Sequence, residues 1–138
     1  MRRLAPQSLA AAFEYVQNEY SLLAAADADQ VLPYCVDHGL RYTAFSPLAG
    51  GFLTGKYRRG EAPPADSRFA NAPEVCEAYA SSEAFDAIEQ LRRDAAKREQ
   101  VMAEAAIRFV LDSPGVDSLI IAPRKIEHFA AMGIEAGA

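Results

Sequence analysis

The string Gly50-Gly-Phe-Leu-Thr-Gly55-Lys56 places two glycines and a lysine at the spacing of a phosphate-binding loop, after a segment typical of a β-strand. The next residue is Tyr57, which does not bind magnesium as a serine or threonine would. The run Arg58-Arg-Gly-Glu-Ala-Pro-Pro64 is unsuited to the helix whose N-terminus would hold the phosphates. A nucleoside-triphosphate loop, and with it a phosphotransferase, is therefore a distant alternative. Lys56 remains a candidate for meeting a phosphate as a point charge.

Other polar residues stand where strands are expected to end. Gln17 and Asn18 close the first expected strand and Ser46 follows the second; in α/β folds, ligands bind at the carboxyl ends of strands. The plainer interpretation is that these side chains form hydrogen bonds within turns. Ser46 is not inside a G-x-S-x-G pattern, so a hydrolase nucleophile is not indicated. We nominate neither His38 nor His128 as a catalytic base, because no acidic residue is placed to orient either ring.

Three short apolar segments predict strands buried on both faces. They are Phe13–Gln17, Arg41–Phe45 and Ser118–Ile121. Helical patterns lie between these strands. Alternating strands and helices predict an α/β fold made of parallel βα units.

Four helices are expected from apolar spacing and end signals. The first is capped by Asp27 or Asp29 and stops at Gly39, the second is capped by Ser81 or Ser82, the third covers about Glu99–Leu111, and the fourth begins near Lys125. The stretch from Gly50 to Pro73 reads as a long loop, and loops of that length are usually functional or disordered. Three βα units are too few for a closed α/β fold, so the 138 residues read as part of something larger.

Composition narrows the class of protein. The net charge of −5 argues against nucleic-acid binding, which needs a basic surface. No apolar stretch reaches the ~18 residues of a membrane span, and the apolar run near the start is too short for a secretory signal. Cys35 and Cys76 fit neither a disulfide framework nor a metal site. We therefore expect a cytoplasmic chain with no metal and with free, half-buried thiols.

Read together, four strings resemble the aldo/keto reductases, and most closely the group that includes bacterial reductases and potassium-channel β subunits. They are Val16–Leu23, Phe45–Tyr57, Ser67-Arg68 and Ser118–Arg124. The resemblance implies a (β/α)8 barrel that reduces aldehydes and ketones with NADPH. It implies that residues 1–138 form a partial reductase domain, the last three βα units, with a cofactor-covering loop at about 50–73.

The resemblance also assigns cofactor-binding residues. Gln17 would bind the nicotinamide carboxamide and Phe45 would stack under the ring. The remaining matched positions are Ser46, Pro47, Leu48, Ala49 and Gly50 along the pyrophosphate, Lys56 and Arg68 on the closing loop, and Arg124 near the adenosine 2′-phosphate. Arg124 would favour NADP over NAD.

Some positions depart from the family pattern. Ala122 stands where glycine is common, and His128, in the cofactor-binding set, stands where glutamine is common. Ala131 and Met132 replace an acid-asparagine pair that grips adenine, which weakens the expectation of adenine binding.

The family's catalytic Asp, Tyr, Lys and His would lie upstream of this chain, so no catalytic residue is assigned here. Without a general acid to protonate the alkoxide, the chain alone is expected not to reduce a carbonyl. It would be the cofactor-side half of a reductase, from a truncated reading frame, a recombinant piece or a split gene. The alternative is a non-catalytic module that binds nucleotide or another protein. Open strand edges predict self-association in either case.

Overall fold

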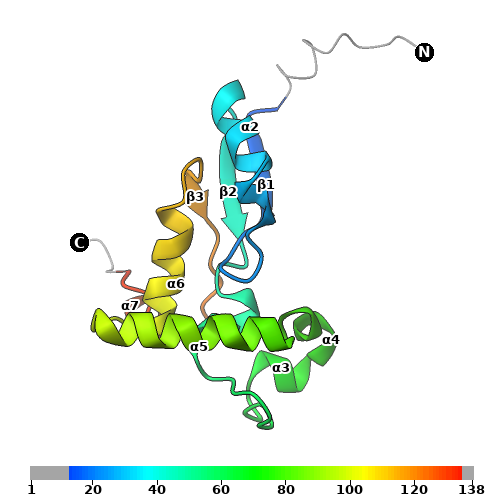
Figure 1. Ribbon diagram of the computed structural model, residues 1–138, viewed down its shortest axis with the longest axis vertical. Helices are drawn as coiled ribbons and strands as arrows, with labels where there is room; N and C mark the ends of the chain where they lie inside the picture. Colours follow the sequence, from blue (N-terminus) through cyan, green and yellow to red (C-terminus); the bar gives the residue numbers. More distant parts are fainter. Residues whose placement is uncertain (1–12, 135–138) are drawn as a thin grey trace.

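The structure is a computed structural model that describes residues 13–134. Three parallel strands form one sheet in the order β1–β2–β3 (Figure 1). Their bounds are β1 (Tyr15–Glu19), β2 (Arg41–Phe45) and β3 (Ser118–Leu119). The predicted α/β class with parallel strands is confirmed. Most of the apolar run near the start of the chain lies outside the described residues.

Helices and 3-10 turns fill the connections between strands. In chain order they are η1 (Ala26–Ala28), α2 (Val31–His38), η2 (Ala49–Thr54), α3 (Arg68–Asn71), α4 (Pro73–Cys76), η3 (Glu77–Tyr79), α5 (Ser82–Lys97), α6 (Met102–Leu111) and α7 (Glu127–Ala130). Figure 1 shows that the segment from η2 to α4 lies beyond the carboxyl ends of the strands. Helix α5 runs across the same end of the sheet. Among the described residues, no helix is both long enough and apolar enough to cross a membrane.

Local signals explain several helix ends. Gly39 terminates α2 with a left-handed φ of 66°, and its N–H donates to carbonyl groups of the last turn. The Ser81 side chain caps α5 by accepting a hydrogen bond from the Ala84 N–H at 3.1 Å. Both predicted end signals are confirmed.

The predicted N-cap of α2 is wrong. Its N-terminus is at Gln30, with no side-chain cap. Asp27 instead accepts hydrogen bonds from the Tyr42 hydroxyl at 2.6 Å and from the Asn18 amide at 2.8 Å. Asn18 therefore forms a side-chain hydrogen bond, as the plainer interpretation expects, but it does so from β1 to Asp27 nine residues away rather than within a turn.

The elements β1, β3 and α6 differ from their predicted bounds, because strand pairing and backbone geometry set where they begin and end. β1 starts two residues later than expected, at Tyr15, which pairs with Arg41. β3 has two residues instead of four, since only Thr43 and Ala44 of β2 are in register with it. α6 begins at Met102, because Glu99 has a left-handed φ of 55°.

The stretch expected to be one long loop from Gly50 to Pro73 is partly helical. It contains most of η2 and all of α3. No helix starts between Thr54 and Arg68, however, so the glycine-lysine string does not lead into the helix that a triphosphate loop requires.

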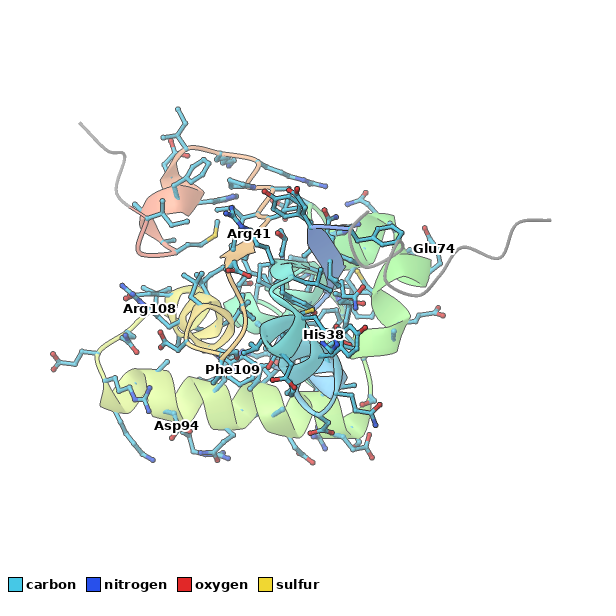
Figure 2. The ribbon with its side chains drawn as sticks, turned by 90° about the horizontal axis from the view of Figure 1, so that it is seen from above. His38, Arg41, Glu74, Asp94, Arg108 and Phe109 are labelled. Atoms are coloured by element: carbon cyan, nitrogen blue, oxygen red, sulfur yellow. The ribbon has the colours of Figure 1, made fainter. Side chains whose placement is uncertain are left out.

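Among the described residues, the helices that pack on the sheet cover one of its faces. α2 and α6 pack on the face that carries Tyr42 and Ala44, both fully buried, in a cluster with Leu32, Cys35 and Val110. Figure 2 shows α2, α5 and α6 on the same side of the strands, with Arg41 on the other. The expectation of strands buried on both faces is therefore wrong.

The uncovered sheet face is made of alternate residues of the three strands. Tyr15 is 59% exposed, Gln17 and Ser118 are also exposed, and the Thr43 and Ser118 hydroxyls lie 2.9 Å apart. The uncovered sheet face is thus largely polar, unlike the opposite face. Both cysteines are free, as expected, but they are fully buried rather than half-buried.

Tyr42 gives a direct test of the packed face. Burial, followed by the hydrogen bond to Asp27, raises the pKa of Tyr42 above its ordinary value of 10.0. We expect Tyr42→Phe to lower the free energy of unfolding by about 1–3 kcal/mol at neutral pH, measured by urea unfolding. Tyr34→Phe, on an exposed tyrosine of α2, should have no effect.

The raised pKa of Tyr42 makes the stability of the fold depend on pH at the alkaline end. The folded state keeps the Tyr42 proton to higher pH than the unfolded state, so this stabilisation is complete below pH 10.0 and is lost as the pH rises above it. Tyr42→Phe should flatten the alkaline loss of stability, and an unchanged alkaline limb would contradict the assignment.

Candidate functional site

The carboxyl ends of β1 and β2 bring two of the predicted residues to one face. Gln17 is in register with Thr43, and Glu19 with Phe45. Because side chains alternate along a strand, Gln17, Glu19 and Phe45 all lie on the uncovered sheet face. Gln17 is exposed and Phe45 is half-buried. A flat ligand could therefore contact both residues at once.

The backbone after β2 turns sharply. Ser46 and Ala49 have left-handed φ values of 53° and 47°, which are uncommon for non-glycine residues. Gly50 and Gly51 follow at 64° and 96°. Such strained backbone clusters at ligand sites, and a right-handed residue followed by a left-handed one directs successive N–H groups to one side, toward an anion. Leu48 and Ala49, at φ −102° and 47°, form such a pair. The Ala49 N–H already donates to the Ser46 carbonyl oxygen at 2.9 Å, so the N–H groups of Leu48 and Gly50 are the ones that an anion could meet.

This glycine turn, residues 46–51, is anchored from beneath. Pro47, Ala49 and Phe52 are buried. The half-buried Leu48 packs against two core clusters, one around Phe52 and one containing Met132. The anchoring leaves Ser46 and Gly50 half-buried at the surface.

Lys56 lies against this turn. A Cβ on Gly51 would come within 2.9 Å of Lys56 Cε, so the absence of a side chain at Gly51 makes room for the lysine. The Lys56 ammonium lies 5.1 Å from the centre of the Tyr57 ring. It makes no ion pair with any residue between 13 and 134. The lysine therefore presents a positive charge beside the glycine turn.

Arg68 reaches the same region through an aromatic contact. The Phe69 N–H donates to the Tyr57 hydroxyl at 3.2 Å, and the two rings meet edge to face with centres 5.6 Å apart. Lys56 and Arg68 are the chain neighbours that precede these two aromatic residues. The contact thus joins the two chain segments that carry Lys56 and Arg68, which are twelve positions apart in the sequence and both exposed.

Two residues at this end of the sheet escaped the sequence analysis. The Tyr79 hydroxyl donates a hydrogen bond to Glu19 Oε1, and a Cβ on Gly50 would lie 3.7 Å from the Tyr79 ring. Burial first, and then the hydrogen bond to Glu19, raises the pKa of Tyr79 to about 12. Glu19 could have been suspected from its place two residues after Gln17. Nothing local points to Tyr79, which is 60 positions away.

Arg124 and His128 occupy a different place. Both are exposed, in the segment after β3 that leads through α7. Met132 is buried against Ala103 and Ile107 of α6, so its side chain belongs to the core, while Ala131 and Ala122 are exposed. The structure does not bring Arg124 or His128 into contact with Lys56 or Arg68.

Two hollows of the described chain are not lined by the glycine turn. One of about 180 Å³ lies between Tyr57 and Phe85, and one of about 350 Å³ lies between α2 and Pro114. Within residues 13–134, no group of three His, Cys, Asp or Glu side chains is placed to hold a metal ion. The glycine turn and the cations near it could bind an anion through positive charge, a hydroxyl group and backbone N–H groups. They lie next to a sheet face suited to a planar ring.

Comparisons with known proteins point to one family. The family model described as "Aldo/keto reductase family" matches residues 6–132. A probable voltage-gated potassium channel β subunit from Arabidopsis thaliana is 35% identical over 107 residues, which are 75% of this chain and 32% of that protein. An uncharacterized oxidoreductase from Bacillus subtilis is 33% identical over 112 residues, 81% of this chain and 32% of that protein.

A solved structure agrees with these sequence matches. The glycerol dehydrogenase of Gluconobacter oxydans superposes with a TM-score of 0.65 at 27% identity, covering 85% of this chain and 35% of the dehydrogenase. The chain thus spans about a third of the length of these relatives.

The glycine turn yields a prediction that needs no cofactor. Gly51→Ala should move Lys56 and weaken binding of inorganic pyrophosphate, measured by calorimetry, by about fivefold, because the lysine charge leaves the turn. Gly60→Ala is the matched control, since Gly60 also has a positive φ, 76°, but has no neighbouring atom within 4 Å. Both variants should lose about 1–2 kcal/mol of stability from backbone strain. Equal pyrophosphate binding by the two would contradict the assignment.

Proposed function

Because the chain belongs to the aldo/keto reductase family, we propose that it is the cofactor-binding portion of an NADP(H)-dependent oxidoreductase that converts a carbonyl group into an alcohol. The family match and the glycerol dehydrogenase neighbour support the oxidoreductase class. The cofactor, the substrate class and the site residues are part of the proposal.

One observation carries the proposal. The uncovered sheet face with Gln17 and Phe45 adjoins the glycine turn, and the turn adjoins Lys56 and Arg68. A dinucleotide has the same order of chemistry, a planar amide-bearing ring followed by a charged pyrophosphate. The gap left by Gly51, which a Cβ would fill, lets the lysine lie against the turn. The donor set therefore fits such a cofactor at its nicotinamide and pyrophosphate parts.

Each residue has a role that its chemistry supports. Gln17 would hold the carboxamide of the ring, and the half-buried Phe45 would stack beneath it, which orients one ring face toward the substrate. Ser46 and the backbone from Pro47 to Gly50 would line the pyrophosphate, whose charge Lys56 and Arg68 would offset. The bound cofactor would supply the hydride for carbonyl reduction.

The adenine end is the weaker part of the fit. Arg124 is exposed and is proposed to meet the 2′-phosphate, with His128 nearby along the chain, which would favour NADP over NAD. Met132 is buried in the core and so offers no polar grip on adenine. The proposed specificity therefore depends on Arg124.

We further propose that residues 1–138 are the last three βα units of a (β/α)8 barrel. The uncovered sheet face and the single partner strand of both β1 and β3 among the described residues support this. The other units of such a barrel would then supply the catalytic Asp, Tyr, Lys and His. A cytoplasmic location is part of the same proposal, supported by the two free, buried cysteines.

A second candidate is a non-catalytic module that binds nucleotide or another protein. The open edges of β1 and β3, each of which has one partner strand among the described residues, favour it, because open strand edges promote association with a further chain or a second copy. The first candidate reduces a carbonyl once the other barrel units are supplied, whereas the second has no turnover; only a module that binds nucleotide would share the cofactor site.

Cofactor binding is the first test. We expect NADPH to bind the full chain near micromolar affinity, with NADH weaker, in calorimetric titrations. Lys56→Met should weaken NADPH binding by about tenfold through loss of one charge-assisted contact. Lys97→Met is the control, because Lys97 is an exposed lysine at the far end of α5, paired with Asp94. Failure of the folded chain to bind NADPH would contradict the proposal.

Turnover is the second test. The chain alone should show no NADPH-dependent reduction of aldehydes or ketones, since it carries no general acid of the family pattern. Activity should appear on mixing with a chain that supplies the other barrel units. Robust turnover by the purified chain would show that the catalytic part of the proposal is wrong.

A further inference from the structure

Glu19 is the one acidic side chain that the three described strands place on the uncovered sheet face. It is in register with Phe45 on the neighbouring strand. Gln17 precedes it by two residues and shares the same face. A planar ring held by Gln17 and Phe45 would therefore have the Glu19 carboxylate as its immediate neighbour.

The position of Glu19 is fixed by Tyr79, whose hydroxyl donates to Glu19 Oε1. The Tyr79 ring is itself held beside Gly50, and its centre lies 5.9 Å from that of Phe52. Because the pKa of Tyr79 is raised to about 12, the phenol remains the donor throughout the neutral range. Glu19 is half-buried, so its charge is screened less than that of an open surface carboxylate.

We infer that Glu19 determines specificity for the redox state of the cofactor, favouring the oxidised nicotinamide ring over the reduced one. The inference rests on the proposed function, in which Gln17 and Phe45 hold that ring. The oxidised ring carries a positive charge and the reduced ring is neutral. A fixed carboxylate beside the ring attracts the first and has little effect on the second.

The cations of this region are expected to act on the overall affinity for the cofactor rather than on the preference between its two redox states. Lys56 and Arg68 lie by the glycine turn and would meet phosphates, which are the same in both redox states. Arg41 lies at the amino end of β2, four residues before Phe45, with its guanidinium 5.7 Å from the centre of the Tyr15 ring. These cations change the overall affinity much more than the ratio between the two redox states.

The test is a pair of calorimetric titrations of the full chain, with NADP⁺ and with NADPH, and the measured quantity is the ratio of the two dissociation constants. Glu19→Gln should weaken NADP⁺ relative to NADPH by at least about threefold. Glu19→Asp keeps the carboxylate and should keep most of the wild-type ratio. Glu14→Gln is the matched control, because it removes the same charge at the opposite end of β1 and should leave the ratio unchanged.

Tyr79→Phe provides a second variant that keeps the ring but removes the donor from Glu19. Because the Glu19 carboxylate is then no longer held in place, the ratio should move toward NADPH, as in Glu19→Gln but by less, and this variant tests the inference if Glu19→Gln does not fold. An unchanged ratio in Glu19→Gln, or a shift toward NADP⁺ in Tyr79→Phe, would overturn the inference. Absence of binding of either cofactor to the folded wild-type chain would overturn the proposed function itself, and the inference with it.

Discussion

The packing of Phe52 against the rings of Tyr57 and Phe69 is the interaction on which the proposed site depends. The ring centre of Phe52 lies 4.5 Å from that of Tyr57 and 5.3 Å from that of Phe69. Phe52 is fully buried directly after the glycine turn, and the other two aromatic residues follow Lys56 and Arg68 in the chain. Apolar burial therefore determines where positive charge lies, because it holds the residues that carry two cations beside a turn that suits an anion.

Features with local causes could be predicted from the sequence. The bounds of β2 follow from an aromatic and β-branched run, the end of α2 from Gly39, and the start of α5 from Ser81. The end of β3 and the role of Asp27 could not, since each is decided by a partner far along the chain. β3 pairs only through Ser118 and Leu119, with Thr43 and Ala44 of β2, and Asp27 accepts a hydrogen bond from the Tyr42 hydroxyl 15 residues away.

The same distinction holds for the site. Gln17 was found from its place at the end of a predicted strand, the glycine turn from the spacing of its glycines and Lys56, and Phe45 from the resemblance. The structure brings them to one end of the sheet. Tyr79 was missed because its contacts with the site, a hydrogen bond to Glu19 and packing beside Gly50, all join residues far apart in the sequence. Arg124 and His128 came from the resemblance alone, and in the structure both are exposed on the segment whose Met132 packs into the core.

Leu48 belongs to two core clusters, one under the glycine turn and one that contains Met132, which follows α7. Because the opening of one cluster would expose part of a side chain that the other cluster shares, we expect the two regions to open together rather than as independent loops. The segment bearing Arg124 is then tied thermodynamically to the turn at the end of β2. Ordering of either segment lowers the entropic cost of ordering the other.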